Sequence, residues 1–430
     1  MSRGVGLTLY SLVMRALQPW VVRKLKRRSR DEPLYGEHIS ERWGQYHTPA
    51  GQGYVWLHAV SLGETRAAAL LLPRLRAQWP SMRLLLTHGT ATGREAGRSL
   101  LQPGDVQVWQ PWDTPQAMQR FLAHFQPRVG LLMETEVWPN WVHACCARGV
   151  PLLLVNARMS ERSSRQAQRL AVLSRPAYAG LSDVWAQTED DARRLRALGA
   201  PVTAVLGNLK FDVQLDERLQ AAGQHACGAL SRPVVVLASS REGEEAAFLD
   251  TLRQQPLALA NARWLIVPRH PQRFDEVAAL MQGAGFAVVR RSQFATLEQA
   301  ATQWAACDEH TLMLGDSLGE MGAYGAMAQV TLMGGSFEPL GGQNLIEPLA
   351  YGSPVVVGPH TFNFEQATQT ALQAGVAVRV QDWQSGVQAA LTWMQRQAQD
   401  PGWPQRCREF VLAHAGAVAR SVERLKTWMP

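Results

Sequence analysis

The chain has 430 residues, more than one hydrophobic core usually serves, and this length suits two domains of about 200 residues each. Its composition, 46% hydrophobic and 18% charged, is ordinary for a globular protein and excludes a disordered chain. Residues 1–30 contain eight basic side chains and no acidic one, so the rest of the chain has 35 basic and 36 acidic side chains. The net charge of +7 therefore belongs to an N-terminal arm, which excludes a basic nucleic-acid-binding body.

Within that arm, residues 5–22 form an apolar segment interrupted at helical spacing by Thr8, Ser11, Arg15 and Gln18. One polar stripe on an apolar helix is typical of a helix that lies in the plane of a membrane. The basic run at 23–30 would meet anionic headgroups on the cytoplasmic side. Residues 1–30 therefore predict attachment to the cytoplasmic face of an inner membrane. A single spanning helix, which Arg15 disfavours, and a plain soluble helix are the alternatives.

The rest of the chain alternates short apolar runs with longer helical patterns, as expected for buried parallel strands in repeated βα units. In the first half the runs are Tyr54–Ala59, Leu84–Thr87, Val129–Met133, Leu152–Val155, Val184–Ala186 and Val202–Leu206. In the second half they are Val234–Ala238, Trp264–Val267, Ala287–Val289, Leu312–Leu314, Val330–Met333 and Val355–Val357.

A polar stretch at residues 213–231 separates the two sets of runs and is interpreted as a linker. The pattern predicts an α/β protein with two doubly wound, Rossmann-like domains, residues 31–212 and 232–430. We expect ligands at the carboxyl ends of the strands, which would face a cleft between the domains. The five cysteines have neither CxxC spacing nor the histidines of a zinc site, so they indicate reduced thiols in the cytoplasm. They are Cys145, Cys146, Cys227, Cys307 and Cys407.

The first strand runs directly into Ser61, Gly63 and Glu64, where Gly63 allows a tight turn. Glu64 is expected in the first turn of the next helix, and the helix dipole there favours an ionised carboxylate that can accept a proton. The alternative is an ordinary capping acid.

Polar side chains also follow two later strands of the first half. Glu134 and Glu136 come after Val129–Met133, where they would orient an acceptor or share the work of a base. Their alternative is a capped helix start with Pro139 in its first turn. Lys210 follows Val202–Leu206 and suits a phosphate or carboxylate, unless it is a surface lysine.

The second half carries basic and glycine-rich segments at its strand ends. Arg269 and His270 follow Trp264–Val267. Three further segments with the same placement are Asp316–Met321, Gly334–Ser336 and the glycine-rich Gly341–Glu347. A glycine-rich turn that enters a helix presents backbone N–H groups to a phosphate. No dinucleotide or P-loop fingerprint is present, so these segments predict a nucleotide site of another kind, in which Glu347 would bind ribose hydroxyls.

Eight motifs, taken in order, closely resemble the Kdo (3-deoxy-D-manno-octulosonate) transferases of lipid A assembly, family 30 of the glycosyltransferases. The motifs are long and span nearly the whole chain, including the basic N-terminal arm. They are HAVSLGE (58–64), METEVWPNW (133–141), NARMSERS (156–163), GNLKFD (207–212), PRHP (268–271), DSLGEM (316–321), GGSFEPLGGQNLIEPLAYG (334–352) and PHTFNF (359–364).

The resemblance implies a GT-B fold with an N-terminal membrane-anchoring helix, an acceptor-binding first domain and a donor-binding second domain. It also implies that the last helix can pack back on the first domain. The implied reaction is an inverting, metal-independent transfer of Kdo from CMP-Kdo to lipid IVA, a step of lipopolysaccharide synthesis in Gram-negative bacteria. No cofactor, nucleic acid or obligate protein partner is expected.

By residue-by-residue match, Glu64 falls on the family's general base, and Glu134 and Lys210 fall on positions that support the transition state. The CMP-contacting positions are Arg269, His270, Leu318, Gly319, Glu320, Asn344, Leu345, Ile346 and Glu347. Further candidates from the same motifs are Ser61, Gly63, Glu136, Gly335 and Ser336. Two competing hypotheses remain: a GT-B enzyme with another donor, such as a heptosyl or UDP-sugar transferase, and a non-catalytic nucleotide-binding or scaffold protein.

Overall fold

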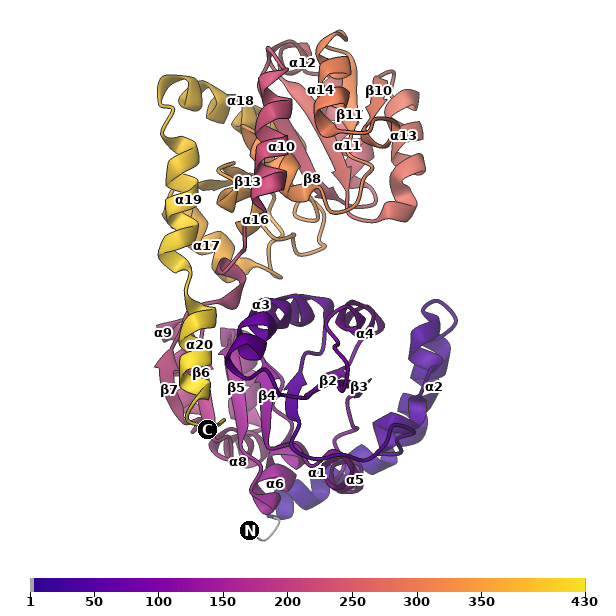
Figure 1. Ribbon diagram of the computed structural model, residues 1–430, viewed down its shortest axis with the longest axis vertical. Helices are drawn as coiled ribbons and strands as arrows, with labels where there is room; N and C mark the ends of the chain where they lie inside the picture. The colour runs from indigo at the N-terminus through magenta and orange to yellow at the C-terminus, as the bar shows by residue number, and fades with distance from the viewer. Residues whose placement is uncertain (1–3, 430) are drawn as a thin grey trace. The chain divides into compact units, whose positions relative to one another are not determined.

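The computed structural model describes residues 4–429 and divides them into two units, each built around one parallel sheet (Figure 1). The N-terminal unit runs to Asp212 and also includes the chain from His414 onward, while the C-terminal unit is Val213–Ala413.

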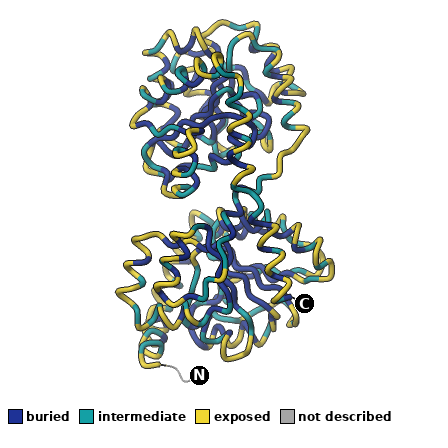
Figure 2. The backbone as a smooth tube through the Cα atoms, turned by 90° about the vertical axis from the view of Figure 1, so that its left-hand side faces the viewer, coloured by how far each residue is buried: buried dark blue, intermediate teal, exposed yellow. Residues whose placement is uncertain are grey.

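The sheet of the N-terminal unit has seven strands in the order β3-β2-β1-β4-β5-β6-β7, and every pair is parallel. They are β1 (Val55–His58), β2 (Leu84–His88), β3 (Val106–Trp109), β4 (Val129–Met133), β5 (Leu152–Ala157), β6 (Asp183–Ala186) and β7 (Val202–Val205). Continuous apolar sequence makes β1, β2, β4 and β5 buried at every position, and these strands are the dark centre of the unit in Figure 2.

Helices cover both faces of this sheet, and Ser61, Thr90, Thr114, Ser160 and Thr188 each cap one of them with a side-chain oxygen. The helices are α3 (Leu62–Gln78), α4 (Ala91–Arg98), α5 (Pro115–Phe125), α6 (Pro139–Arg148), α7 (Glu161–Arg169), α8 (Ala171–Ala179), α9 (Glu189–Ala197) and the 3-10 turn η3 (Leu209–Phe211). Two 3-10 turns, η1 (Pro33–Gly36) and η2 (Ile39–Trp43), precede β1.

The last helix, α20 (Ala417–Leu425), is part of the N-terminal unit, where its buried Val418 and Leu425 pack with α3 residues such as Leu71. Two backbone N–H groups at its start, of Gly416 and Val418, donate to the carboxylate of Asp212. The chain thus returns to the first unit after the second is complete.

The sheet of the C-terminal unit also has seven parallel strands, in the order β10-β11-β9-β8-β12-β13-β14. They are β8 (Val234–Ser240), β9 (Arg263–Pro268), β10 (Ala287–Arg290), β11 (Thr311–Leu314), β12 (Val330–Met333), β13 (Val355–Val357) and β14 (Ala377–Arg379). The helices are α10 (Glu217–Gly228), α11 (Glu244–Arg253), α12 (Pro256–Asn261), α13 (Phe274–Gly283), α14 (Leu297–Ala305), α15 (Met321–Met327), α16 (Ile346–Ala350), α17 (Glu365–Gln373), α18 (Trp383–Gln399) and α19 (Trp403–His414), with 3-10 turns η4 (Pro271–Arg273) and η5 (Arg291–Gln293).

Two features of the body differ from the sequence prediction. The expected linker 213–231 contains α10, whose buried Gly223 lies so close to α15 that a Cβ there would be 2.2 Å from the Ala323 carbonyl oxygen. This stretch is therefore part of the second unit. The edge strands β3 and β14 were not predicted; both are only partly buried, and each contains a polar residue, Gln107 in β3 and Arg379 in β14.

The N-terminal arm forms two helices, α1 (Val5–Ala16) and α2 (Gln18–Arg28), which bend by 46° at a break. Pro19 accounts for the break, because it has no N–H to donate to a carbonyl of the preceding turn. Among residues 4–429 no single helix is long and apolar enough to cross a membrane, although the bent pair passes that test by length and composition.

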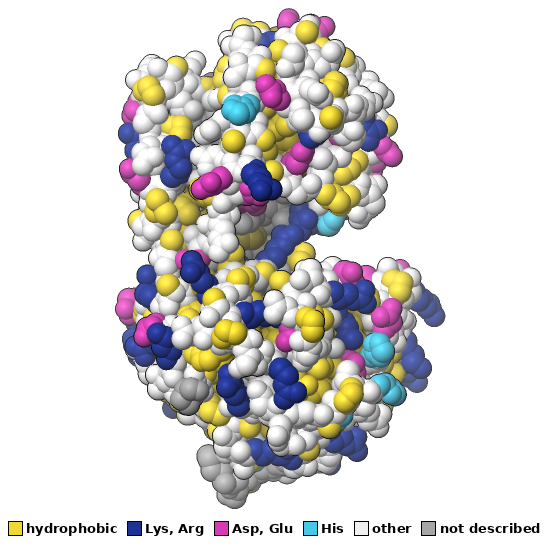
Figure 3. Space-filling view, viewed as in Figure 1, with side chains coloured by type: hydrophobic (Ala, Val, Ile, Leu, Met, Phe, Trp, Pro, Cys, Tyr) yellow, Lys and Arg dark blue, Asp and Glu magenta, His cyan; other side chains and the backbone are white. Residues whose placement is uncertain are grey.

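Two residues of the arm's polar stripe bind the rest of the N-terminal unit. The Ser11 hydroxyl donates to Asn140 Oδ1 at 2.9 Å, and Arg15 Nε donates to Gln116 Oε1 at 3.1 Å. Apolar side chains of the arm are exposed instead. The exposed fractions are 62% for Leu9, 55% for Leu12 and 59% for Trp20. Figure 3 shows Lys and Arg side chains gathered over α2, at the right-hand edge of this unit.

Candidate functional site

The two sheets reverse their strand order once each, and crevices at such switch points are where doubly wound sheets bind ligands. In the N-terminal unit the switch lies between β1 and β4, and in the C-terminal unit between β8 and β12. Glu64 comes shortly after β1 and Glu134 directly after β4, so these two predicted residues stand on either side of the first switch. The glycine turn at Gly334 comes directly after β12, on the second switch.

Glu64 occupies the third position of α3, which begins at Leu62, so it lies in the first helical turn as predicted. Its carboxylate turns back to accept the Val60 N–H at 2.6 Å, while the Ser61 hydroxyl accepts the Glu64 N–H at 3.4 Å. Ser61 therefore caps α3, and Glu64 binds the residue before the cap, so the capping interpretation holds as a description of the local structure. Gly63 is exposed beside it.

The ionisation of Glu64 differs from expectation. Burial, followed by the negative charge of Glu134, raises the pKa of Glu64 to about 8, although the Val60 N–H opposes that rise. The helix dipole alone would have favoured the ionised form, but it does not prevail at a side chain that is 8% exposed. A carboxyl group with a pKa near 8 is a much stronger base than an ordinary glutamate and is therefore suited to general base catalysis.

Glu134 lies at the centre of a buried ion-pair cluster with Lys210 and Arg158, which we call the Glu134 cluster. Lys210 Nζ is 3.0 Å from Glu134 Oε1, and Arg158 Nε is 2.7 Å from Glu134 Oε2. The structure thus brings together Glu64, Glu134 and Lys210, which the sequence placed on three separate strand ends. No role was predicted for Arg158, although it lies in the NARMSERS motif directly after β5.

Glu136 is held differently from Glu134, by a 2.7 Å hydrogen bond from Trp138 Nε1. Burial raises its pKa, and its charge also acts on Glu64, more weakly than that of Glu134. The backbone distinguishes the two acids further, because Glu134 has φ +59°, a left-handed conformation that glutamate rarely adopts. Asn156 and Ser239, also at strand ends, share this strain (φ +54° and +59°), which is common at functional sites.

At the second switch point, the chain turns through Gly334 and Gly335. A Cβ on Gly334 would be 2.5 Å from the Ser239 carbonyl oxygen, and Gly335 has φ +68°, so both positions require glycine. The fully buried carboxylate of Glu244 accepts the N–H groups of Gly335 at 2.6 Å and Phe337 at 3.2 Å. Glu244 holds the turn in place. This role was not predicted from the sequence, because Gly335 lies 91 residues away from Glu244 along the chain.

Three predicted donor-site residues have buried side chains. The Ser336 hydroxyl donates to the Met333 carbonyl and accepts the Gly358 N–H, so it is engaged within the turn. Leu345 and Ile346 are 1% and 0% exposed and belong to the interior. Only the backbone of these three residues is placed to meet a ligand.

The remaining donor-site residues are at least partly accessible. Leu318, 75% exposed, and Gly319 form a loop after β11, while the Glu320 carboxylate is bound by Arg291 at 2.7 Å and by the Ser317 hydroxyl. Burial, and then the charges of Arg241 and Arg269, lower the pKa of His270. The side chain of Asn344 accepts the Ile346 N–H at 3.2 Å at the entry of α16, which carries Glu347 in its first turn.

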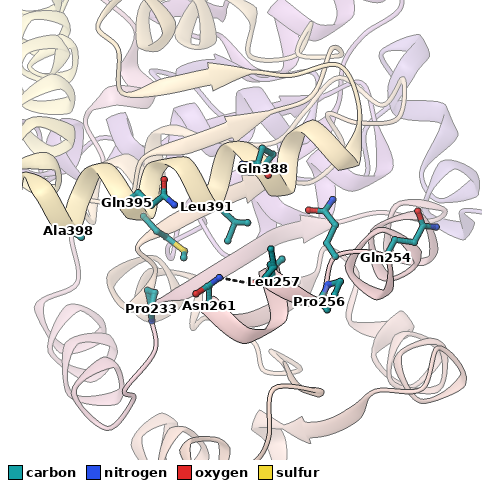
Figure 4. Close-up of a pocket in the computed structure, with 12 residues that line it drawn as sticks. Pro233, Gln254, Pro256, Leu257, Asn261, Gln388, Leu391, Gln395 and Ala398 are labelled. Atoms are coloured by element: carbon teal, nitrogen blue, oxygen red, sulfur yellow. Dashed lines mark hydrogen bonds between the residues drawn. The ribbon is translucent and has the colours of Figure 1, made fainter.

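Other groups stand apart from this arrangement. In residues 4–429, no three His, Cys, Asp or Glu side chains are grouped to hold a metal ion. A hollow of about 600 Å³ between α12 and α18 is lined by amides such as Gln254 and Gln395 (Figure 4). Its residues Pro233 and Asn261 lie at the amino ends of β8 and β9, away from every predicted site residue.

Comparison with known proteins finds relatives over the whole length of the chain. A family model described as 3-Deoxy-D-manno-octulosonic-acid transferase (kdotransferase) matches residues 37–213. The chain is 44% identical to a 3-deoxy-D-manno-octulosonic acid transferase of Bordetella pertussis over 100% of both chains. It is 28% identical to the Haemophilus influenzae protein of the same name over 98% of each.

Solved structures resemble the chain in fold. A glycosyltransferase from Rickettsia africae has a TM-score of 0.54 at 11% identity, covering 88% of this chain and 99% of that chain. The S. aureus MnaA–UDP co-structure has a TM-score of 0.53 at 12% identity, covering 88% and 97%. With these neighbours, the two Rossmann-like units confirm the predicted GT-B class.

Proposed function

The chain belongs to the 3-deoxy-D-manno-octulosonic acid transferases, and from that premise we propose that it transfers Kdo from CMP-Kdo to a hydroxyl of lipid IVA with inversion. The observation that carries the proposed mechanism is the Glu64 carboxyl at the β1–β4 switch point, buried and with its pKa raised to about 8. Glu64 takes the proton of the acceptor hydroxyl as the hydroxyl oxygen attacks the anomeric carbon of Kdo. The bond from that carbon to the CMP phosphate breaks, and CMP leaves with the electron pair.

The residues of the C-terminal unit act on the leaving group. As CMP departs, its phosphate gains negative charge, which Arg269 and the helix start at Asn344–Leu345 would stabilise. Glu347 lies in the first turn of α16, where its carboxylate is placed to accept ribose hydroxyls. The reaction as written needs no metal ion, so we expect turnover to be unaffected by EDTA.

The variant Glu64→Gln tests the base. The Gln side chain still accepts the Val60 N–H but cannot take a proton, so kcat should fall at least about 100-fold while CMP-Kdo binding is retained. The activity is measured as nucleotide release in the presence of lipid IVA. Release of CMP, and not of UDP or ADP, identifies the donor as a CMP-sugar. The matched control is Glu189→Gln, another acid in a first helical turn, whose side chain is 81% exposed. Near-normal turnover of Glu64→Gln would refute the assignment.

We also propose that α1 and α2 attach the enzyme to the cytoplasmic face of the inner membrane, where a lipid acceptor would be found. The support is the orientation of α1: two residues of its polar stripe bind the rest of the N-terminal unit and its apolar Leu9 and Leu12 are exposed, beside the basic α2. Replacing Leu9, Leu12 and Trp20 with serine should release the protein from anionic vesicles and leave its Tm unchanged. Serine at Leu257 and Leu412, equally exposed on the other unit, is the control. Equal vesicle binding by all three proteins would contradict attachment through α1.

A further inference from the structure

Arg158 stands at the carboxyl edge of the N-terminal sheet, and the mechanism described so far does not use it. Its backbone N–H donates to the Glu134 carbonyl at 3.1 Å, and the next residue, Met159, donates to the Asp191 carboxylate at 2.8 Å. The main chain is thus fixed on both sides of Arg158. The side chain therefore leaves the sheet from a rigid base, as a binding residue requires.

The guanidinium of Arg158 is oriented by one of its nitrogens. Nε donates to Glu134 Oε2 at 2.7 Å, and Glu134 itself is 2% exposed, so this end of the side chain is buried. Within residues 4–429 the two terminal amino groups of Arg158 donate to no protein acceptor, and the side chain is 45% exposed. A planar cation that is held at Nε and open at its outer edge has the fork geometry that matches a phosphate or carboxylate.

The charges of the Glu134 cluster favour an anion at this position. Glu134 pairs with two cations, of which Lys210 is 16% exposed and Arg158 is 45% exposed. Arg158 is therefore the cation of the cluster that an anion can reach from solvent. The charge of Arg158 also acts on the Glu64 carboxyl, which locates it in the neighbourhood of the proposed base.

We infer that Arg158 binds an anionic oxygen group of a substrate through its terminal amino groups, while Glu134 positions its guanidinium. The inference rests on the proposed function, which supplies two substrates with such a group: the phosphates of the lipid acceptor and the carboxylate of the sugar donor. In either case the bound anion pairs with Arg158 and lies in the neighbourhood of Glu64.

The experiment compares wild-type protein with Arg158→Gln and Arg158→Lys in detergent micelles. CMP release is measured while either substrate is varied, with lipid acceptors that carry two, one or no phosphates. Loss of one charge-assisted contact should raise the KM of the affected substrate about 10- to 100-fold, with a smaller rise for Arg158→Lys. The control is Arg165→Gln on α7, which removes a cation whose side chain is 69% exposed and should change neither KM.

The two sources of the anion give different results. If the acceptor phosphate is the ligand, wild type and Arg158→Gln should have the same acceptor KM once the phosphates are removed. If the donor carboxylate is the ligand, the KM for CMP-Kdo should rise while inhibition by CMP, which lacks the sugar, is unchanged. Unchanged KM values for both substrates in Arg158→Gln would overturn the inference, because Arg158 would then serve only to neutralise Glu134.

Direct binding of each substrate to wild type and Arg158→Gln keeps this inference separate from the proposed function. A wild-type protein that binds both substrates but releases no CMP would refute the proposed function. In that case, a tenfold or greater loss of substrate affinity in Arg158→Gln would still support the role of Arg158, and equal affinity would exclude it.

Discussion

A buried glutamate lies at each of the two switch points, Glu134 in the N-terminal unit and Glu244 in the C-terminal unit, but these two carboxylates bind different donors. Glu134 pairs with the side chains of Arg158 and Lys210. Glu244 accepts backbone N–H groups, among them that of Gly335. The first switch point therefore presents charged side chains that act on the pKa of Glu64, while the second presents a shaped backbone. This difference matches a division between proton transfer and nucleotide binding.

The variant Gly334→Ala is expected to have the largest effect on the second switch point. It tests that switch point directly, because its effect depends on backbone shape alone. The added Cβ would lie 2.5 Å from the Ser239 carbonyl oxygen and 2.7 Å from Ser240 Cα, so the turn or β8 has to move. CMP affinity, measured by calorimetry, should fall at least about tenfold, since movement of the turn also displaces Gly342, whose N–H donates to the Gly335 carbonyl at 2.6 Å in the segment that leads to Asn344. Gly283→Ala, where a Cβ would meet nothing within 4 Å, is the control. If Gly334→Ala and Gly283→Ala had equal CMP affinity, the Gly334 turn would not be part of the nucleotide site.

Glu347→Ala tests a side chain of the C-terminal unit to which a binding role is assigned. Loss of its contact with the ribose hydroxyls should weaken CMP binding by about tenfold or less, with kcat less affected. Because Glu347 lies in the first turn of α16, thermal unfolding should be followed in parallel to separate helix loss from ligand loss. A CMP affinity equal to that of wild type would remove Glu347 from the nucleotide site.

The fold was largely predictable because its central strands are continuous apolar runs, and every predicted run forms a strand. The pairing of charges was not predictable in the same way. Arg158 and Glu134 are 24 residues apart, and Glu244 and Gly335 are 91 apart, so each pair exists only after the sheet has formed. The raised pKa of Glu64 depends likewise on burial and on Glu134, whereas the local sequence contributes only the helix dipole.

A smaller effect is expected from Glu134→Gln on the pH dependence of kcat/KM. Removing the negative charge that raises the pKa of Glu64 should bring that pKa below about 8, and Arg158 and Lys210, left without their partner, act in the same direction. The acidic limb of the profile should therefore move to lower pH by roughly one unit, whatever happens to its height. Glu136→Gln, whose charge acts more weakly on Glu64, should move the limb less. A limb that stays in place would mean that Glu134 does not tune the base.

The smallest effect concerns stability, and it follows from the same carboxyl. The pKa of Glu64 is about 8 in the folded protein and near 4.5 when unfolded, so across this interval the folded state holds a proton that the unfolded state releases. The wild type should therefore lose stability as the pH rises from about 4.5 to 8, and Glu64→Gln should not lose this increment. The Tm difference in favour of the variant should grow by a few degrees across that window, and Glu189→Gln should show no such trend. A difference that is constant with pH would mean that Glu64 is ionised at little cost in the folded protein. The first switch point would then resemble the second, with a carboxylate that serves only to hold the backbone.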